Sequence, residues 1–139
     1  MSAATDALAA ALAAEHAAIF GYGAIGARLT GPALTQAQQA EAVHRTRRDA
    51  LVDRLTTVGI TPPAAQPAYG LPFPVTDQVS AIRLAVQLEE RVAAIWRSAL
   101  GPTRGDERKL ALDALTDCAL RAARWRRAGG DSPGTVPLP

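Results

Sequence analysis

The sequence predicts a single all-α domain, a four-helix bundle in which a long, proline-rich segment joins the second helix to the third. Three observations lead to this prediction. The chain has 139 residues, the length of one ordinary domain. Aromatic residues make up only 4% while alanine and leucine are abundant, a composition that favours closely packed helices. Glycine and proline divide the chain into four segments of helical periodicity.

Each of these segments carries apolar side chains at helical spacing and stops at a glycine, which proline follows in two cases. Thr35 and Gln38 have the spacing of a capping box at the start of the second helix. The last residues are rich in proline and show no periodicity. We therefore expect a bundle domain over residues 1–129 and a tail over 130–139. The helices are expected at about 5–29, 35–58, 76–100 and 103–128.

The lengths of the three connections predict how the helices are arranged. The first and third connections contain about five residues or fewer, which favours antiparallel hairpins. The second, from Gly59 to Val75, can span roughly 50 Å when extended, whereas a helix of about 24 residues is roughly 36 Å long. It can therefore cross the whole bundle, and five prolines stiffen it. This short-long-short pattern is typical of ferritin-like connectivity, with the second and third helices parallel.

Charge, cysteine content and hydropathy exclude several other classes of protein. A formal net charge of +2, with both signs mixed along the chain, offers no strong field for nucleic acid or membrane. The single Cys118 cannot form an intramolecular disulfide. We expect that no run reaches the roughly 18 apolar residues of a membrane span, and the start lacks the basic region of a signal peptide. We expect a cytoplasmic protein that binds neither membrane nor nucleic acid.

Several short motifs resemble those of a known family. They are Ala14-Glu15-His16 followed by Ala17 to Gly23, His44-Arg45 followed by Arg47-Arg48-Asp49, Pro67-Ala68-Tyr69 followed by Leu71-Pro72, and Leu88-Glu89 ahead of Ala93-Ala94-Ile95-Trp96. With these motifs the sequence is similar to the small actinobacterial ferritin-like family of unknown function, over nearly the whole chain up to about Arg127. The resemblance implies the ferritin-like fold and no established activity.

A ferritin-like bundle raises the question of a metal site. Di-iron proteins of this fold place a glutamate on each of two helices and a Glu-x-x-His on each of the other two. Here Glu15 and Glu89 lie on the apolar sides of the first and third predicted helices. Glu41 and His44 form one Glu-x-x-His on the second helix, and the fourth has no histidine. Half of a di-iron site is therefore present.

The expected register of the first hairpin argues against that site. If residues at equal distance from the turn face each other, Glu15 is level with Arg48 or its neighbour, and Glu41 lies roughly 10 Å away along the axis. The same rule, applied to the hairpin of the third and fourth helices, puts Glu89 opposite Asp117. We therefore predict a buried polar layer of Glu15, Arg48, Glu89 and Asp117. In this layer the Arg48 guanidinium pairs with carboxylates in place of metal ions.

Two hypotheses on function follow. The first is a metal-free, non-catalytic bundle without a cofactor, which acts through protein contacts as a homo-oligomer, most simply a dimer. The second is a degenerate iron-binding or manganese-binding bundle. Its candidate ligands are Glu15, Glu41, His44 and Glu89.

Other residues have simpler structural explanations. Cys118 lies in an alanine-rich segment without an adjacent base and is expected to be a small core residue. His44 is expected to be a satisfied or exposed histidine of its helix. Ala17, Gly21 and Gly23 give the first helix a surface of small side chains, which another helix should bury because glycine otherwise only weakens the helix.

Overall fold

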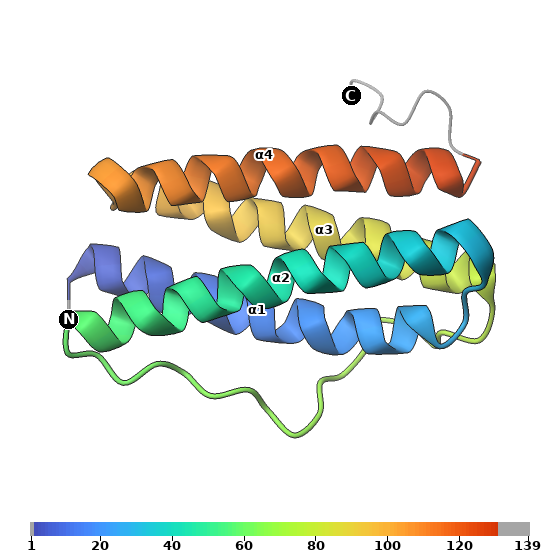
Figure 1. The fold of residues 1–139 in the computed structure, drawn as a ribbon, viewed down its shortest axis with the longest axis horizontal. Helices are drawn as coiled ribbons and strands as arrows, with labels where there is room; N and C mark the ends of the chain where they lie inside the picture. The colour runs from blue at the N-terminus through green and yellow to red at the C-terminus, as the bar shows by residue number, and fades with distance from the viewer. Residues whose placement is uncertain (1, 131–139) are drawn as a thin grey trace.

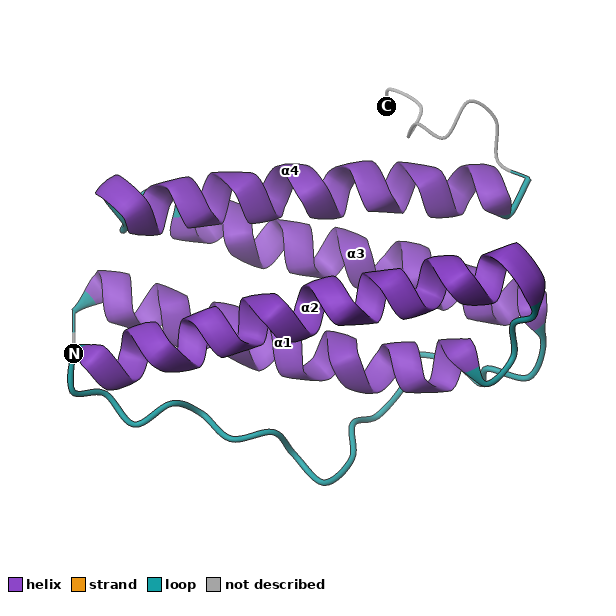
Figure 2. Ribbon diagram, in the orientation of Figure 1, coloured by secondary structure: helices purple, strands orange, loops and turns teal. Residues whose placement is uncertain are grey.

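The computed structural model describes residues 2–130 and contains four α-helices. Their bounds are Ala3–Gly26 for α1, Gly31–Thr57 for α2, Gln78–Ala99 for α3 and Gly105–Ala128 for α4. No strand occurs in this part of the chain (Figure 2). The prediction of an all-α protein with four helices is therefore confirmed. Except for its first residue, the expected tail over 130–139 lies outside the described residues.

The first hairpin turn lies earlier in the chain than predicted. Helix α1 ends at Gly26, and α2 already begins at Gly31. Gly31 has a φ of 60°, in the left-handed region that favours glycine, and Pro32 follows in the first turn, where its missing N–H costs nothing. The predicted capping box at Thr35 is therefore wrong, because this residue is already inside α2. The earlier turn changes which residues of α2 face α1.

The helices pack as two hairpins laid side by side. Helix α1 packs against α2 and α3, and α3 also packs against α4. Figure 1 shows α1 antiparallel to α2 and α3 antiparallel to α4, while α2 and α3 run in the same direction. The segment over residues 58–77 runs outside the four helices along much of their length (Figure 1).

The core consists mainly of alanine and leucine side chains, with three buried large aromatics, Tyr22, Trp96 and Trp125. Small residues let α1 and α3 approach closely. A Cβ atom at Gly21 would lie 2.5 Å from Leu88 Cδ1. The expected burial of small residues therefore applies to Gly21, whereas Gly23 is exposed within this chain and a Cβ there would meet nothing within 4 Å.

Helix α1 is also long and apolar enough to cross a membrane, with a mean hydropathy of 1.4 over an 18-residue window. The expectation that no segment reaches this level is therefore wrong. Length and composition are weak evidence for a span, because the core helix of a soluble protein or a signal sequence passes the same test. In the structure Leu8, Leu12 and Ile25 of this helix are completely buried by its neighbours.

Candidate functional site

The centre of the bundle holds a histidine between two glutamates. His44 of α2, Glu15 of α1 and Glu89 of α3 are completely buried. His44 Nδ1 lies 2.8 Å from Glu15 Oε1, and His44 Nε2 lies 2.9 Å from Glu89 Oε2. Since carboxylates only accept hydrogen bonds, both ring nitrogens donate and the ring is an imidazolium. Burial alone would lower the pKa of His44, but hydrogen bonds to the two glutamates and their charges raise it to about 9.

At the edge of this centre, two arginines donate hydrogen bonds to the same aspartate. Arg47 Nη2 donates to Asp117 Oδ2 at 3.0 Å, and Arg47 Nη1 lies 3.8 Å from Glu15 Oε2. Arg121 Nη1 donates to the same Asp117 oxygen at 2.6 Å and lies 3.7 Å from Glu89 Oε1. Burial would raise the pKa of Asp117, but the hydrogen bonds from Arg121 and Arg47 hold it below its ordinary value.

The ionised groups of this charged centre balance one another. Three carboxylates face one imidazolium and two guanidinium groups, so three negative charges meet three positive charges. Burying charge is tolerated only where it is paired and hydrogen-bonded, which this arrangement provides. The groups of the charged centre are Glu15, Glu89, Asp117, His44, Arg47 and Arg121.

Hydrogen bonds link the charged centre to the end of α4. The Tyr22 hydroxyl donates to Glu89 Oε2, and Trp125 Nε1 donates to the Tyr22 hydroxyl at 3.0 Å. The Tyr22 ring also stacks on the His44 ring, with 5.6 Å between centroids. Burial, together with the nearby Glu89 charge, raises the pKa of Tyr22 well above its ordinary value. Tyr22 therefore stays protonated and acts as a fixed hydrogen-bond donor.

A thiol and an unsatisfied carboxylate oxygen lie beside the histidine. Cys118 is buried, and burial raises the pKa of its thiol, so it is protonated at neutral pH. Glu89 Oε1 is buried without a hydrogen-bond partner. One ligand atom from each of His44, Glu89 and Cys118 lies within 4.8 Å of the others. These three side chains together could hold a metal ion.

The prediction that Arg48 pairs with the central carboxylates is wrong. Its side chain is 28% exposed, and its Nε donates to Asp49 Oδ1 at 3.0 Å. Arg47 is the residue of α2 that reaches Glu15 and Asp117. The cause is the earlier first turn, which makes His44 rather than Arg48 level with Glu15. Glu15 and Glu89 lie in the buried layer, while Asp117 is half-buried at its edge.

The alternative iron or manganese ligand set is not assembled as predicted. Glu15, His44 and Glu89 come together, but Glu41 accepts a hydrogen bond from the exposed Arg45 at 3.2 Å. Cys118 is a buried core residue, as expected, and it also lies next to His44 and Glu89, which was not expected.

Sequence reasoning also missed the roles of Arg47 and Arg121. The helical i,i+4 spacing of Asp117 and Arg121 was a signal for the second of these. Nothing in the sequence around Arg47 distinguishes it from Arg48.

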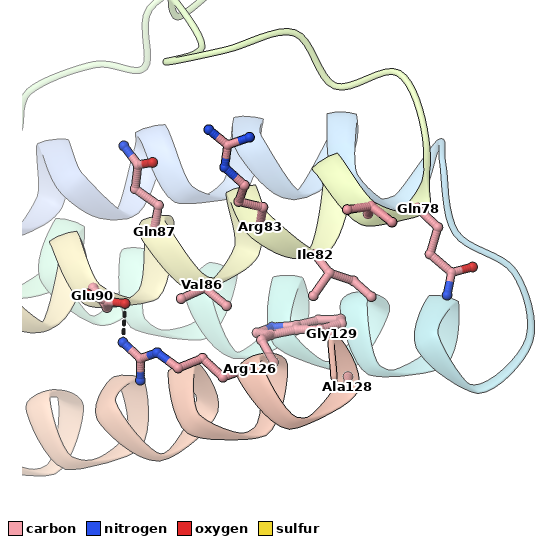
Figure 3. Close-up of a pocket in the computed structure, with 11 residues that line it drawn as sticks. Gln78, Ile82, Arg83, Val86, Gln87, Glu90, Arg126, Ala128 and Gly129 are labelled. Atoms are coloured by element: carbon pink, nitrogen blue, oxygen red, sulfur yellow. Dashed lines mark hydrogen bonds and ion pairs between the residues drawn. The ribbon is translucent and has the colours of Figure 1, made fainter. Parts of the chain in front are cut away.

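Outside the charged centre, a hollow of about 650 Å³ lies between α3 and the C-terminal end of α4 (Figure 3). Its charged side chains are already satisfied. Arg126 forms an ion pair with Glu90, and the Arg83 guanidinium lies 4.2 Å from the centroid of the Phe73 ring. Glu90 and Arg126 are therefore paired with each other, and Arg83 is held against an aromatic ring.

Fold and site together define an all-α, four-helix protein with a buried group of histidine, glutamate and cysteine side chains. The chain belongs to the family described as "Domain of unknown function (DUF4439)", whose model matches residues 7–139. A solved structure of similar fold is that of a conserved hypothetical protein, rv2844, from Mycobacterium tuberculosis. It is 38% identical, the match covers 92% of this chain and 98% of that chain, and the TM-score is 0.88. A search of curated proteins found no match.

Proposed function

We propose that this chain is a ferritin-like, non-catalytic bundle that acts through protein contacts. In its centre, cationic side chains instead of metal ions neutralise the buried carboxylates. The observation that carries the proposal is the engagement of His44 at both ring nitrogens by Glu15 and Glu89. These glutamates lie on the helices where a di-iron bundle carries metal-binding acids. The parallel α2 and α3, with the long segment between them beside the bundle, support the ferritin-like assignment (Figure 1).

Two further observations support a metal-free and non-catalytic centre. Arg47 and Arg121 place positive charge within 4 Å of Glu15 and Glu89, which opposes the entry of another cation. His44 is completely buried, so a substrate cannot touch its ring unless the helices separate. The centre then serves to hold the four helices together, and function is left to the outer surface.

Metal analysis of protein purified without an affinity tag tests this proposal. We expect far less than one equivalent of iron, manganese or zinc per chain, and no change in unfolding temperature when these metals are added. Stoichiometric iron or manganese that disappears in both His44→Ala and Glu41→Ala would overturn the proposal and restore the ligand set predicted from the sequence. Loss in His44→Ala but not in Glu41→Ala would instead show a metal site of different composition.

One observation favours a second candidate, a site for a single Zn²⁺ ion. His44 Nε2, a Glu89 carboxylate oxygen and Cys118 Sγ are close enough to share an ion, and nitrogen and thiolate ligands suit zinc. Glu15 at Nδ1 would then orient the histidine ring. Binding would displace one proton from His44 and one from Cys118, so a doubly charged ion would replace two protons. The net charge of the centre would not change.

Calorimetry in buffers of different ionisation enthalpy distinguishes the two candidates. The zinc site predicts one Zn²⁺ bound per chain, two protons released, and affinity that rises with pH. Cys118→Ser should abolish that binding, whereas Glu41→Ala should leave it intact. Without such binding, the metal-free centre stands.

We extend the proposal to a homodimer formed through α4. Leu112 and Leu120 lie two turns apart on one side of this helix, and each is more than half exposed. Contact with a second copy of the chain would remove these two apolar side chains from water, which is favourable. In sedimentation velocity we expect a dimer that Leu112→Lys combined with Leu120→Lys dissociates. The same change at the exposed Val58, near the end of α2, is the control and should leave the dimer intact.

A further inference from the structure

A groove outside the charged centre has the lining of a ligand site. It lies between α1, α3 and residues 69–72, and its volume is about 460 Å³, within the roughly 300–1000 Å³ of known small-molecule sites. Its lining is mainly apolar, with small side chains from α1 and leucines from α3. We propose that this groove binds a small amphipathic carboxylate, a fatty acid with one flexible apolar chain. This inference goes beyond the proposed function and does not depend on it.

The segment that borders the groove is fixed on both sides without filling it. The Tyr69 ring packs on Phe20 of α1, with 5.4 Å between centroids, and its hydroxyl accepts a hydrogen bond from the Gln66 backbone at 3.0 Å. Phe73 is held under the Arg83 guanidinium of α3. Between these contacts Leu71 reaches the groove but remains 37% exposed. Residues 69–72 therefore form a rim and leave the hollow beneath them open.

The shape of the groove favours an extended apolar chain. Gly21 permits Leu88 to lie against α1, which closes the floor, while Ala17 beside it is half-buried and leaves space. Along α3 the lining runs from Leu84 to Ile95, about 16 Å at 1.5 Å per residue. A flexible chain lying along this length would cover the exposed faces of Leu71 and Ile95. Removing that apolar surface from water is favourable.

Two polar side chains on one side of the groove favour a ligand with a single anionic head group. Gln87 and Arg91 lie one helical turn apart on α3, and both line the groove. Neither forms a hydrogen bond, ion pair or ring contact with another described residue. A guanidinium presents two parallel N–H groups that match the two oxygens of a carboxylate. This distinguishes the groove from the hollow of Figure 3, in which Arg126, Glu90 and Arg83 already have partners.

Isothermal titration calorimetry with decanoate and its neutral analogue 1-decanol tests the charge preference. We expect one decanoate per chain, bound more tightly than 1-decanol. Arg91→Gln should weaken decanoate binding about tenfold and leave 1-decanol unchanged. Arg97→Gln, at an exposed arginine of α3 outside the groove, is the matched control and should change neither. Equal affinity of wild-type protein and Arg91→Gln for decanoate would overturn the proposal.

A second pair of variants locates the binding on the groove itself. Ala17→Leu places a larger side chain in the groove and should weaken both probes at least tenfold. Ala13→Leu is the same change one turn earlier, at an exposed position of α1 outside the groove, and should have no effect. Circular dichroism checks that both variants are folded. Unchanged decanoate binding in a folded Ala17→Leu protein overturns the proposal. So does a dimer in sedimentation velocity that Ala17→Leu dissociates, because a second copy of the chain would then occupy the groove.

Discussion

The charged centre and the exposed ion pairs use the same kinds of side chain with very different consequences. Glu41 and Arg45 form an i,i+4 pair on α2 at 3.2 Å, and their side chains are 29% and 51% exposed. Such pairs contribute about 0.3–0.5 kcal/mol. Glu15 and Glu89 lie at similar distances from His44 but are completely buried with it, and removing one partner of a buried pair costs about 3–5 kcal/mol. Burial, rather than the presence of an ion pair, therefore decides which charges determine stability.

The largest expected effect is that of His44→Ala. This change leaves Glu15 and Glu89 without their shared donor, so the free energy of unfolding should fall by about 3–5 kcal/mol in urea titrations. His16→Ala is the control. His16 forms one hydrogen bond at the edge of the bundle, to the Pro63 carbonyl at 3.0 Å, and its loss should cost about 1 kcal/mol. His16 is also largely buried, so equal effects of the two variants would show that the ion pairs of the charged centre add nothing beyond one ordinary hydrogen bond.

The free energy of unfolding should also depend on pH, by an amount similar to the effect of His44→Ala, because His44 titrates within the charged centre. The pKa of His44 is about 9 in the folded chain and about 6.5 when unfolded. Because the folded pKa is higher, the stabilisation is complete below about pH 6.5 and is lost as the pH rises through about 9. The total loss is on the order of 3 kcal/mol.

Urea unfolding between pH 6 and 8.5 measures most of this loss. Above that range the Cys118 thiol, whose pKa burial also raises, adds a loss of the same sign. His44→Ala should remove the dependence between pH 6 and 8.5, and an unchanged slope in that variant would assign it to other groups. Nuclear magnetic resonance titration of the His44 ring gives its pKa directly.

Two adjacent arginines give a smaller but well-matched comparison. Arg47→Met removes a largely buried guanidinium that contacts Glu15 and Asp117, and should cost about 2–3 kcal/mol. Arg48→Met removes a surface group paired with Asp49, and should cost no more than about 0.5 kcal/mol. Thermal unfolding of both variants measures the difference. The reverse order would support the hairpin register predicted from the sequence over the one in the structure.

The smallest effect is expected at the exposed pair of α2. Arg45→Ala should reduce the free energy of unfolding by less than about 0.5 kcal/mol, and added salt should reduce the effect further. A loss comparable to that of His44→Ala, measured in the same urea titrations, would show that exposure does not weaken ion pairs in this protein.

The candidate site shows how far the sequence could lead. Glu15 and Glu89 lie among apolar residues at helical spacing, and this pattern was enough to place both inside the bundle. The partner on α2 was not predictable in the same way. A turn that begins three residues earlier brings His44 level with Glu15, and each residue along a helix changes direction by about 100°. That small shift is why Arg47, and not Arg48, reaches the carboxylates.

The sequence by itself determined the four helices and the lengths of their connections, because periodicity, glycine and proline act locally on the backbone. Only the tertiary structure decided which charged groups meet. The imidazolium between two glutamates, the unsatisfied Glu89 Oε1 and the open groove beside Ala17 all depend on distances between helices. Those distances follow from side-chain packing, such as Leu88 against Gly21, where a single methyl group would change the fit.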